Sequence, residues 1–280
     1  MTATWYPFAI AAALVLALVP PLAGLARRIG LVDDPDRIRK LHETPIPLVG
    51  GLAVFAAMVL AVTSAVALGW VSVDATDVRE MLGLLAASTL LVAVGVVDDR
   101  FGLRGRQKLL GQVAAVTLLV ASGYQFTQLV FIVPFEFGSF SVFVVYAWCL
   151  AAINAVNLLD GADGFASTVG IVASLAMGVL CSLHHGTVDA AVCFALAGGL
   201  AGFLRFNFPP ARAYLGDAGS MLVGLVLSAI AIRSSFKQAA LYAFAAPAAM
   251  LAIPFIDTAA AIVRRRLTGR SIYHEDRGHM

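Results

Sequence analysis

Long apolar stretches separated by short polar segments follow one another along the whole sequence. Nine stretches can each be fitted to a membrane-spanning helix of about 20 residues, and they cover residues 5–26, 50–70, 80–97, 109–124, 140–157, 166–184, 190–205, 220–233 and 239–263. Each stretch is continuously apolar, whereas the strands of a transmembrane β-barrel alternate between apolar and polar residues. The pattern therefore predicts an all-α polytopic membrane protein with about nine transmembrane helices, forming a single domain over residues 1–280.

The composition agrees with a membrane-embedded chain. Hydrophobic residues make up 60% of the sequence and charged residues 13%, which is about half the charged share of an ordinary soluble domain. The three cysteines, Cys149, Cys181 and Cys193, lie within apolar stretches without metal-binding spacing, so we expect buried small side chains. The formal net charge of +2 gives no reason to expect a nucleic-acid partner.

The basic residues divide unevenly between the two ends of the predicted helices. If the first helix runs inward, all 19 Lys and Arg residues except Arg79, Arg233 and Lys237 fall on the cytoplasmic side. Cytoplasmic segments of membrane proteins are enriched in Lys and Arg. The distribution therefore predicts the orientation, and it supports the number of spans because one missed helix would scramble the asymmetry.

Five polar clusters fall on this same cytoplasmic side. They cover residues 39–51, 96–108, 154–167, 207–220 and 264–279, and the opposite side has only scattered polar residues. A transporter usually places its polar groups near the middle of the membrane instead. One charged face and one bland face indicate a membrane enzyme or receptor that acts on cytosolic solutes.

The cluster between the fifth and sixth stretches reads NAVNLLDGADGFAS. Asn154, Asn157 and Asp160 are spaced by three residues, so they share one side of any helix that continues through them. Asp163 follows, and the neighbouring glycines let the backbone approach a ligand closely. Polar groups at a membrane boundary can be helix caps, but four of them within ten residues predict a site for a hydrophilic ligand.

Further carboxylates lie near the ends of predicted helices. Asp98 and Asp99 end the third stretch among several cations, where a charge-balanced loop is an equally good interpretation. Asp217 lies between two glycines where the eighth helix begins, and it could bind a metal or simply cap the helix. Asp257 lies deeper, in the ninth stretch, where an ionisable residue is a functional candidate unless it pairs with a neighbouring helix.

Together the clusters supply hard oxygen ligands and many cations. Asp98, Asp99, Asn157 and Asp217 suit Mg²⁺ or Mn²⁺ rather than zinc or copper. The residues predict a Mg²⁺-dependent enzyme that joins a phosphorylated cytosolic donor to an acceptor in the membrane. The last cluster has poor histidine spacing for zinc but arginines that match phosphate oxygens, and its candidates are Arg270, His274, Asp276, Arg277 and His279.

An ordered set of motifs resembles one enzyme family. The motifs are P-x-P-x-x-G-G, V-D-D-x-x-G-L, N-x-x-N-x-x-D-G-x-D-G, L-G-D-x-G-S, P-x-x-D and H-x-D-R-x-H, and they run from Pro45 to His279. The set resembles the polyprenyl-phosphate N-acetylhexosamine-1-phosphate transferases, and more closely the bacterial undecaprenyl-phosphate N-acetylglucosamine-1-phosphate transferases. The branch that transfers phospho-MurNAc-pentapeptide typically has three consecutive histidines in the last loop, where this sequence reads HEDRGH.

The resemblance implies a reaction and a location. A UDP-N-acetylhexosamine, namely UDP-GlcNAc, would give its sugar 1-phosphate to an undecaprenyl or decaprenyl phosphate and release UMP. The product would start a cell-envelope glycan, such as lipopolysaccharide or teichoic acid. The protein would lie in the bacterial inner membrane with its active site facing the cytoplasm. Mg²⁺, or Mn²⁺ in its place, is the expected cofactor, and a homodimer is a further expectation.

The resemblance also implies roles for individual residues. Asn157 and Asp217 resemble the Mg²⁺ ligands, Asp98 and Asp99 resemble the pair that handles the lipid phosphate, and Lys108 resembles the lysine that holds the pyrophosphate. Asp257, within the P-x-x-D motif, joins the catalytic set.

Substrate contacts are implied in two other regions. Tyr214 occupies the position where the family stacks an aromatic ring on uracil, and Asp160 and Asp163 match positions near the nucleotide. Asn154 is placed with these residues, although helix packing explains it equally well. The last loop of the sequence resembles the family's loop that binds the sugar and phosphate, and its candidate residues are Arg270, His274, Asp276, Arg277 and His279.

Two other functions remain open at this point. Transfer of phospho-MurNAc-pentapeptide would need the same site with a different nucleotide sugar, and an ion-coupled transporter would use the aspartates as an ion path. One departure concerns the C-terminal end, because the family usually continues the last motif into further histidines and at least one more span. The sequence stops at Met280, so we expect this end of the family domain to be missing.

Overall fold

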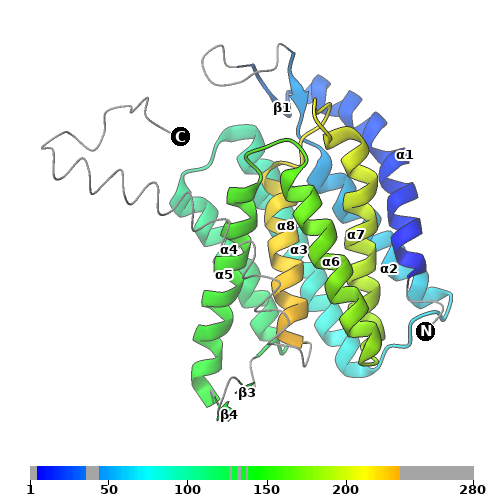
Figure 1. Cartoon of the computed structure of the whole chain (residues 1–280). Coiled ribbons are helices and arrows are strands. Elements are labelled where there is room, and N and C mark those ends of the chain that lie inside the picture. Colours follow the sequence, from blue (N-terminus) through cyan, green and yellow to red (C-terminus); the bar gives the residue numbers. More distant parts are fainter. Residues whose placement is uncertain (1–4, 36–43, 126–127, 131–133, 137, 234–280) are drawn as a thin grey trace, which may run out of the picture.

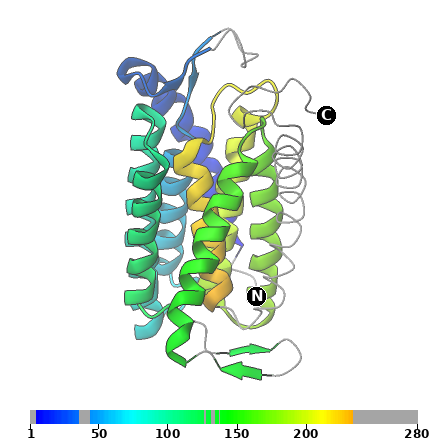
Figure 2. The same cartoon turned by 90° about the vertical axis from the view of Figure 1, so that its left-hand side faces the viewer.

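A bundle of α-helices contains most of the residues that the structure describes. The computed structural model describes residues 5–35, 44–125, 128–130, 134–136 and 138–233. The helices lie side by side in both views (Figures 1 and 2). Eight run through these residues, namely α1 (Tyr6–Ile29), α2 (Gly50–Ala67), α3 (Ala75–Phe101), α4 (Gly105–Ala121), α5 (Ser141–Leu159), α6 (Phe165–Leu183), α7 (Thr187–Asn207) and α8 (Gly216–Arg233).

Seven of the eight helices are long and apolar enough to cross a membrane, and α4 is the exception because it has 17 residues. The all-α prediction is confirmed for the bundle. The count of about nine transmembrane helices is not, since the ninth predicted stretch, residues 239–263, lies outside the described residues. Each of the other eight stretches coincides with one helix, with ends that differ by several residues.

Two short antiparallel hairpins were not predicted. One pairs β1 (Val32–Asp33) with β2 (Ile46–Pro47), and the other pairs β3 (Gln128–Val130) with β4 (Pro134–Glu136). They lie at opposite ends of the bundle (Figure 1), and a one-turn 3₁₀ helix follows the second. Segments of two or three residues are too short for a periodic pattern to reveal them.

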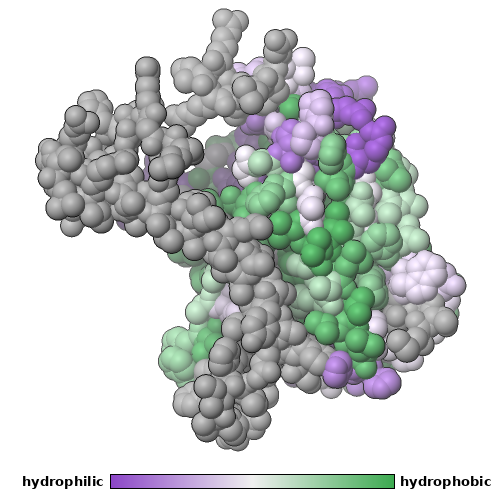
Figure 3. Space-filling view, viewed as in Figure 1, coloured by the Kyte–Doolittle hydropathy of each residue, from purple (hydrophilic) through white to green (hydrophobic). Residues whose placement is uncertain are grey.

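Successive helices run in opposite directions, so every second connection lies at the same end of the bundle. The end at which α1, α3, α5 and α7 finish is called the site end below. In Figure 3 the sides of the helices are mainly apolar, and hydrophilic residues gather at the ends. The opposite end has Arg79 and Arg233, whereas the other described Lys and Arg residues belong to the site end: Arg27, Arg28, Arg100, Arg104, Arg106, Lys108, Arg205 and Arg212.

Helix α8 lies at the centre and packs against α2, α3 and α5. Small residues allow this close packing, as is common between membrane helices. A Cβ atom added to Gly51 would lie 2.3 Å from the backbone nitrogen of Gly219, and one added to Gly95 would lie 2.3 Å from the Cα atom of Ala218. The first turn of α8 is therefore in backbone contact with α2 and α3, which brings Asp217 close to the end of α3.

An ion-pair network joins helices at the opposite end of the bundle. Arg233, at the end of α8, lies 2.6 Å from Asp77 of α3 and 2.7 Å from Asp189 of α7, and it also pairs with Glu80. Unpaired charges at a membrane boundary are costly. This network thus gives a structural reason for three acidic residues at the opposite end, Asp77, Glu80 and Asp189.

Candidate active site

Lys108 is the centre of a group of polar side chains from four helices. Its ammonium lies 3.0 Å from Oδ2 of Asp98 and 2.7 Å from Oδ2 of Asp217, and it donates a hydrogen bond of 3.1 Å to Oδ1 of Asn157. Lys108 lies in the first turn of α4, and the oxygens of Asp98, Asp217 and Asn157 belong to α3, α8 and α5, respectively. The predicted candidates from three separate motifs therefore meet at one point.

Asp98 and Asp99 are neighbours in α3 but face different partners. Oδ1 of Asp98 accepts a hydrogen bond of 2.7 Å from the backbone N–H of Leu103, while its Oδ2 faces Lys108. Asp99 accepts hydrogen bonds from the backbone N–H groups of Asp217 (2.8 Å) and Ala218 (3.3 Å). Asp99 is thus a cap, supplied by another helix, for the N-terminus of α8.

Gly216 makes this cap feasible. Its φ is +73°, in the left-handed region that favours glycine, and an added Cβ atom would lie 2.6 Å from Oδ2 of Asp99. A larger residue would strain the backbone and displace the carboxylate. The first glycine of the L-G-D-x-G-S motif therefore serves the contact between α3 and α8.

Asn157 is held in one orientation near the C-terminal end of α5. Its amide N–H groups donate to Oδ1 of Asp217 and, at 2.9 Å, to Oγ of Ser220. Since both donors point at α8, the amide oxygen of Asn157 faces Lys108. Every N–H group of this side chain is used, so the direction of its oxygen is determined by the fold.

A cavity of about 840 Å³ lies beside this group at the site end. It is bordered by the α5–α6 connection, the segment between α7 and α8, and the β1–β2 hairpin. A polar cavity of this size can hold a ligand of several rings. Its lining includes six of the predicted site residues: Asp99, Asn157, Asp160, Asp163, Tyr214 and Asp217.

Main-chain hydrogen bonds hold the cavity walls together. Oδ2 of Asp163 accepts a 2.9 Å bond from the N–H of Ala211, which links the two connections. The N–H of Tyr214 donates to the carbonyl of Pro47, and the N–H of Gly50 donates to the carbonyl of Tyr214. The P-x-P-x-x-G-G motif therefore positions the segment that carries Tyr214.

Two ionisable groups on the connections that border the cavity, Asp160 and Tyr214, have raised pKa values. Burial, followed by the negative charges of Asp217 and Asp99, raises the pKa of the Asp160 carboxyl to about 8. Burial and the charges of Asp163 and Asp33 raise the pKa of the Tyr214 hydroxyl. Both groups are thus shifted first by burial and then by nearby carboxylates, whose negative charge a cation would offset.

The oxygen donors around Lys108 are of the types that bind divalent cations. Asp98, Asp217 and Asn157 direct oxygens at one cationic group, the ammonium of Lys108. Carboxylate and amide oxygens are the ligands that Mg²⁺ prefers. The described part of the chain contains no group of three or more His, Cys, Asp or Glu residues arranged for a metal. A Mg²⁺ site here would therefore depend on the amide of Asn157 together with carboxylates.

Sequence reasoning missed two residues of the cavity, Asn207 and Asp33. Asn207 is buried at the end of α7, where it accepts hydrogen bonds from Gly164 and Ser167 and donates one of 3.1 Å to the carbonyl of Ala213. It joins the two connections that border the cavity. Its position as the first residue of a polar cluster was the available signal.

The structure brings most, but not all, of the predicted residues together. Asn154 does not line the cavity, because its side chain bonds to Gln112 and to the carbonyl of Leu150. The other predicted site residues lie outside the described residues, namely Asp257, Arg270, His274, Asp276, Arg277 and His279.

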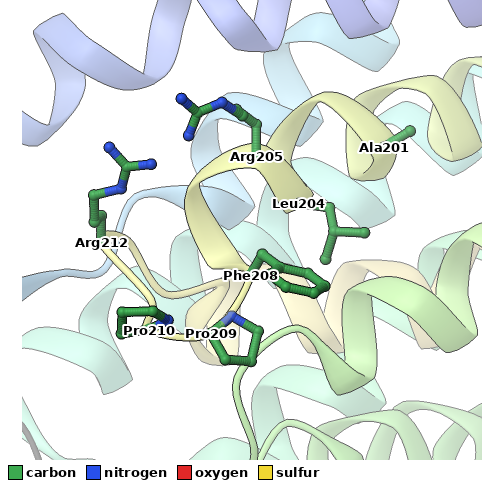
Figure 4. A pocket seen from close by; sticks show the side chains of 7 residues that line it. All are labelled: Ala201, Leu204, Arg205, Phe208, Pro209, Pro210 and Arg212. Carbon is green, nitrogen blue, oxygen red and sulfur yellow. The ribbon is translucent and has the colours of Figure 1, made fainter.

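A second hollow of about 610 Å³ lies on the other side of the segment after α7. Figure 4 shows Arg205 and Arg212 beside it, with Phe208 and two prolines below them. None of the predicted site residues lines this hollow. The candidate active site is therefore the larger cavity next to Lys108.

Comparison with known protein families gives a match over more than half of the chain. Residues 81–235 match the family described as glycosyl transferase family 4. The matched region runs from within α3 to the end of α8 and so contains Lys108 and its partners Asp98, Asn157 and Asp217.

Several curated proteins are similar over nearly the whole chain. A Bacillus subtilis protein, named probable undecaprenyl-phosphate N-acetylglucosaminyl 1-phosphate transferase, is 28% identical over 98% of this chain and 75% of its own length. A decaprenyl-phosphate N-acetylglucosaminephosphotransferase of Mycobacterium tuberculosis is 32% identical over 93% of this chain and 70% of its own length. An Escherichia coli undecaprenyl-phosphate alpha-N-acetylglucosaminyl 1-phosphate transferase is 29% identical over 91% and 69%.

Proposed function

The chain belongs to glycosyl transferase family 4, and from this membership we propose that it transfers N-acetylglucosamine 1-phosphate from UDP-GlcNAc to a polyprenyl phosphate. The names of its relatives in Bacillus, Mycobacterium and Escherichia support this sugar and this class of lipid acceptor. UMP is the second product. The lipid-linked sugar would start a cell-envelope glycan.

The observation that carries the proposal is the meeting of Lys108, Asp98, Asp217 and Asn157 beside a polar cavity at one end of a membrane bundle. Transfer between phosphates needs mainly positioning and neutralisation of charge. A lysine surrounded by hard oxygen ligands suits both tasks. The location suits an acceptor that remains in the membrane while its phosphate reaches the aqueous side.

The proposed reaction exchanges one phosphoanhydride bond for another. An oxygen of the lipid phosphate attacks the sugar-bearing phosphorus of UDP-GlcNAc, and the bond from that phosphorus to the bridging oxygen breaks. UMP leaves with the bridging oxygen. The second pKa of a phosphate monoester is about 6, so at neutral pH much of the acceptor needs no base to become a dianion.

The residues of the chain would then position and neutralise the reacting groups. The ammonium of Lys108 would neutralise pyrophosphate oxygens, and Asp98 would hold that ammonium in place. Asp217 and Asn157, with Asp98, would hold Mg²⁺, which when bound supplies charge neutralisation at the phosphates. Asp99 caps α8 and so would act by positioning Asp217.

The nucleotide would occupy the cavity between the two connections. Tyr214 offers an aromatic ring for uracil, and Asp160 and Asp163 lie on the same wall. Asp257 and the residues of the last loop belong to the proposal as contacts for the lipid phosphate and the sugar. The cations gathered at the site end favour an orientation with this end in the cytoplasm of a bacterial inner membrane.

The test is an assay of the purified full chain in detergent or lipid vesicles. UDP-GlcNAc, undecaprenyl phosphate and Mg²⁺ are expected to give UMP and a pyrophosphate-linked lipid in equal amounts. Chelation with EDTA should abolish the reaction, and Mg²⁺ or Mn²⁺ should restore it. Product formation without UMP, or full activity in EDTA, would contradict the proposal.

Two alternatives have distinct outcomes in the same assay. UDP-MurNAc-pentapeptide in place of UDP-GlcNAc tests the sister reaction, and preference for that donor would change the assigned sugar. Ion flux without any UMP release would indicate a transporter.

A further inference from the structure

A hydrogen-bonded amide pair, formed by a buried Gln112 and an exposed Asn154, lies one helical turn below the candidate active site. Gln112 of α4 and Asn154 of α5 exchange two hydrogen bonds, of 2.8 Å from Nδ2 of Asn154 to Oε1 of Gln112 and of 3.3 Å in the reverse direction. Gln112 is only 1% exposed. Neither residue lines the cavity beside Lys108, so the pair has no direct part in binding.

The remaining donors of the pair are also used. The second N–H of Asn154 donates 2.8 Å to the carbonyl of Leu150 in its own helix, and Nε2 of Gln112 also lies 3.5 Å from the sulfur of Met221 in α8. Burying the amide of Gln112 inside a membrane bundle is unfavourable unless its groups are hydrogen-bonded. This satisfied network therefore allows one relative position of α4 and α5 and disfavours others.

The pair is in register with the catalytic contact above it. Gln112 follows Lys108 by four residues in α4, and Asn154 precedes Asn157 by three residues in α5, so each amide lies one turn below one member of the Lys108–Asn157 hydrogen bond. Helix α4 packs chiefly against α3, and its contact with α5 is much smaller. Polar contacts must therefore supply much of the alignment between Lys108 and Asn157.

We propose that Gln112 and Asn154 are positioning residues that hold the ammonium of Lys108 at the amide oxygen of Asn157. The inference rests on the proposed transfer reaction, for which these two side chains neutralise and bind phosphates and metal. Errors of about 1 Å in such contacts can lower a rate by about 100-fold. Loss of the amide pair lets α4 and α5 shift relative to each other, and this shift lowers mainly kcat.

The test compares variants that keep side-chain size but remove the hydrogen bonds. Gln112→Met and Asn154→Leu are expected to lower kcat at least about tenfold, to leave the KM for UDP-GlcNAc within about threefold, and to raise the Mg²⁺ concentration needed for half-maximal rate. Exchange of the two residues, Gln112→Asn with Asn154→Gln, preserves the pair and is expected to recover most of the rate that either single exchange loses.

A matched control removes another polar contact between the same two helices. The hydroxyl groups of Thr117 and Tyr146 lie 2.7 Å apart, farther from the site and on an exposed face. Tyr146→Phe should leave kcat, KM and the Mg²⁺ requirement unchanged. Thermal unfolding of every variant in detergent, followed by circular dichroism, separates a local shift from failure to fold.

The outcomes distinguish this inference from the proposed function. An inactive wild-type protein would contradict the proposed function itself. An active wild-type with Gln112→Met and Asn154→Leu at full rate would overturn the positioning role. Equal losses in Tyr146→Phe, or single exchanges that the double exchange does not rescue, would also overturn it, because general helix packing would then explain the losses.

Discussion

At the scale of single residues, the chemistry depends on how each carboxylate is compensated. Asp98 and Asp217 share the ammonium of Lys108, whereas Asp99 is neutralised by backbone N–H groups of α8. Asp160 is affected differently, because burial and the negative charges of Asp217 and Asp99 raise the pKa of its carboxyl. Residues of one type thus acquire different roles from their surroundings.

Removing the charge of Asp217 should nearly abolish transfer. Asp217→Asn keeps the shape of the side chain but removes the anion that Lys108 contacts at 2.7 Å. Loss of one preorganised electrostatic contact typically lowers kcat by about 100- to 1,000-fold, and we expect a loss in this range. UMP release measures it. Asp74→Asn makes the same change of charge at the start of α3, far from the cavity, and should keep wild-type activity.

The raised pKa of Asp160 predicts that the stability of the fold depends on pH. Its pKa is about 8 in the folded protein and about 4 in an unfolded chain, so the folded state holds the proton more tightly. The contribution of Asp160 to the free energy of unfolding is therefore fully present below about pH 4 and is lost as the pH rises through about 8. Asp160→Asn has no proton to lose, so it should come close to wild type near pH 4 and exceed it at pH 9, by an amount on the order of a few kcal/mol.

Unfolding in detergent at both pH values, with EDTA present, measures this difference. Asp33→Asn, which changes another carboxylate of the same cavity, serves as the comparison. A constant difference between wild type and Asp160→Asn across this range would contradict the raised pKa.

At the scale of elements, close contacts between helices decide where the site residues meet. The start of α8 touches the backbone of α2 and α3 because Gly51, Gly95 and Gly219 have no side chains. Without these contacts Asp217 would lie farther from Asp99 and Lys108. The glycines of the motifs are therefore as necessary to the geometry as the charged residues.

A single methyl group at this contact should be damaging. Gly95→Ala places a Cβ atom 2.3 Å from the Cα atom of Ala218, and overpacking of this kind costs about 1–3 kcal/mol. We expect a lower unfolding midpoint and a reduced rate of transfer. Gly105→Ala is the control, since nothing lies within 4 Å of its added Cβ atom, and alanine is favoured over glycine in a helix. Equal behaviour of the two variants would exclude this packing argument.

At the scale of the whole molecule, charge asymmetry predicts which end faces the cytoplasm. Labelling of cysteines in intact bacterial cells can test this orientation, because Cys149, Cys181 and Cys193 are all buried. A membrane-impermeant maleimide should label Thr76→Cys, at the opposite end, and leave Arg104→Cys, at the site end, unlabelled until the cells are opened. Both positions are exposed. The reverse labelling would show the opposite orientation in the membrane and would exclude a cytosolic nucleotide sugar as the donor.

Much of the fold could be predicted because a membrane restricts the available structures. A chain that crosses lipid must satisfy its backbone within helices of about 20 residues, so apolar stretches revealed α1 to α8. The candidate site was predictable for a related reason, since ionisable residues are rare in such helices and stand out. Asp217 was identified in this way, Asn157 through the spacing within its polar cluster and Lys108 through the family resemblance, and the structure brings the three together.

Other features could not be read from the pattern. Gln112 and Asn207 are polar residues with no unusual spacing, and their importance depends on partners 42 and 43 positions away in the sequence. The difference between Asp98 and Asp99 also has no signal in the sequence. It depends on which side of α3 faces the start of α8.

The sequence alone determined the helical architecture, the end of the bundle where chemistry is possible, and the residue types that could perform it. These properties follow from local composition and periodicity, because lipid and water act on each segment separately. The tertiary structure decided which oxygens surround Lys108, which carboxylate caps α8, and which amides align α4 with α5. Such contacts join residues far apart in the chain, and a hydrogen bond depends on tenths of an ångström that only packing can set.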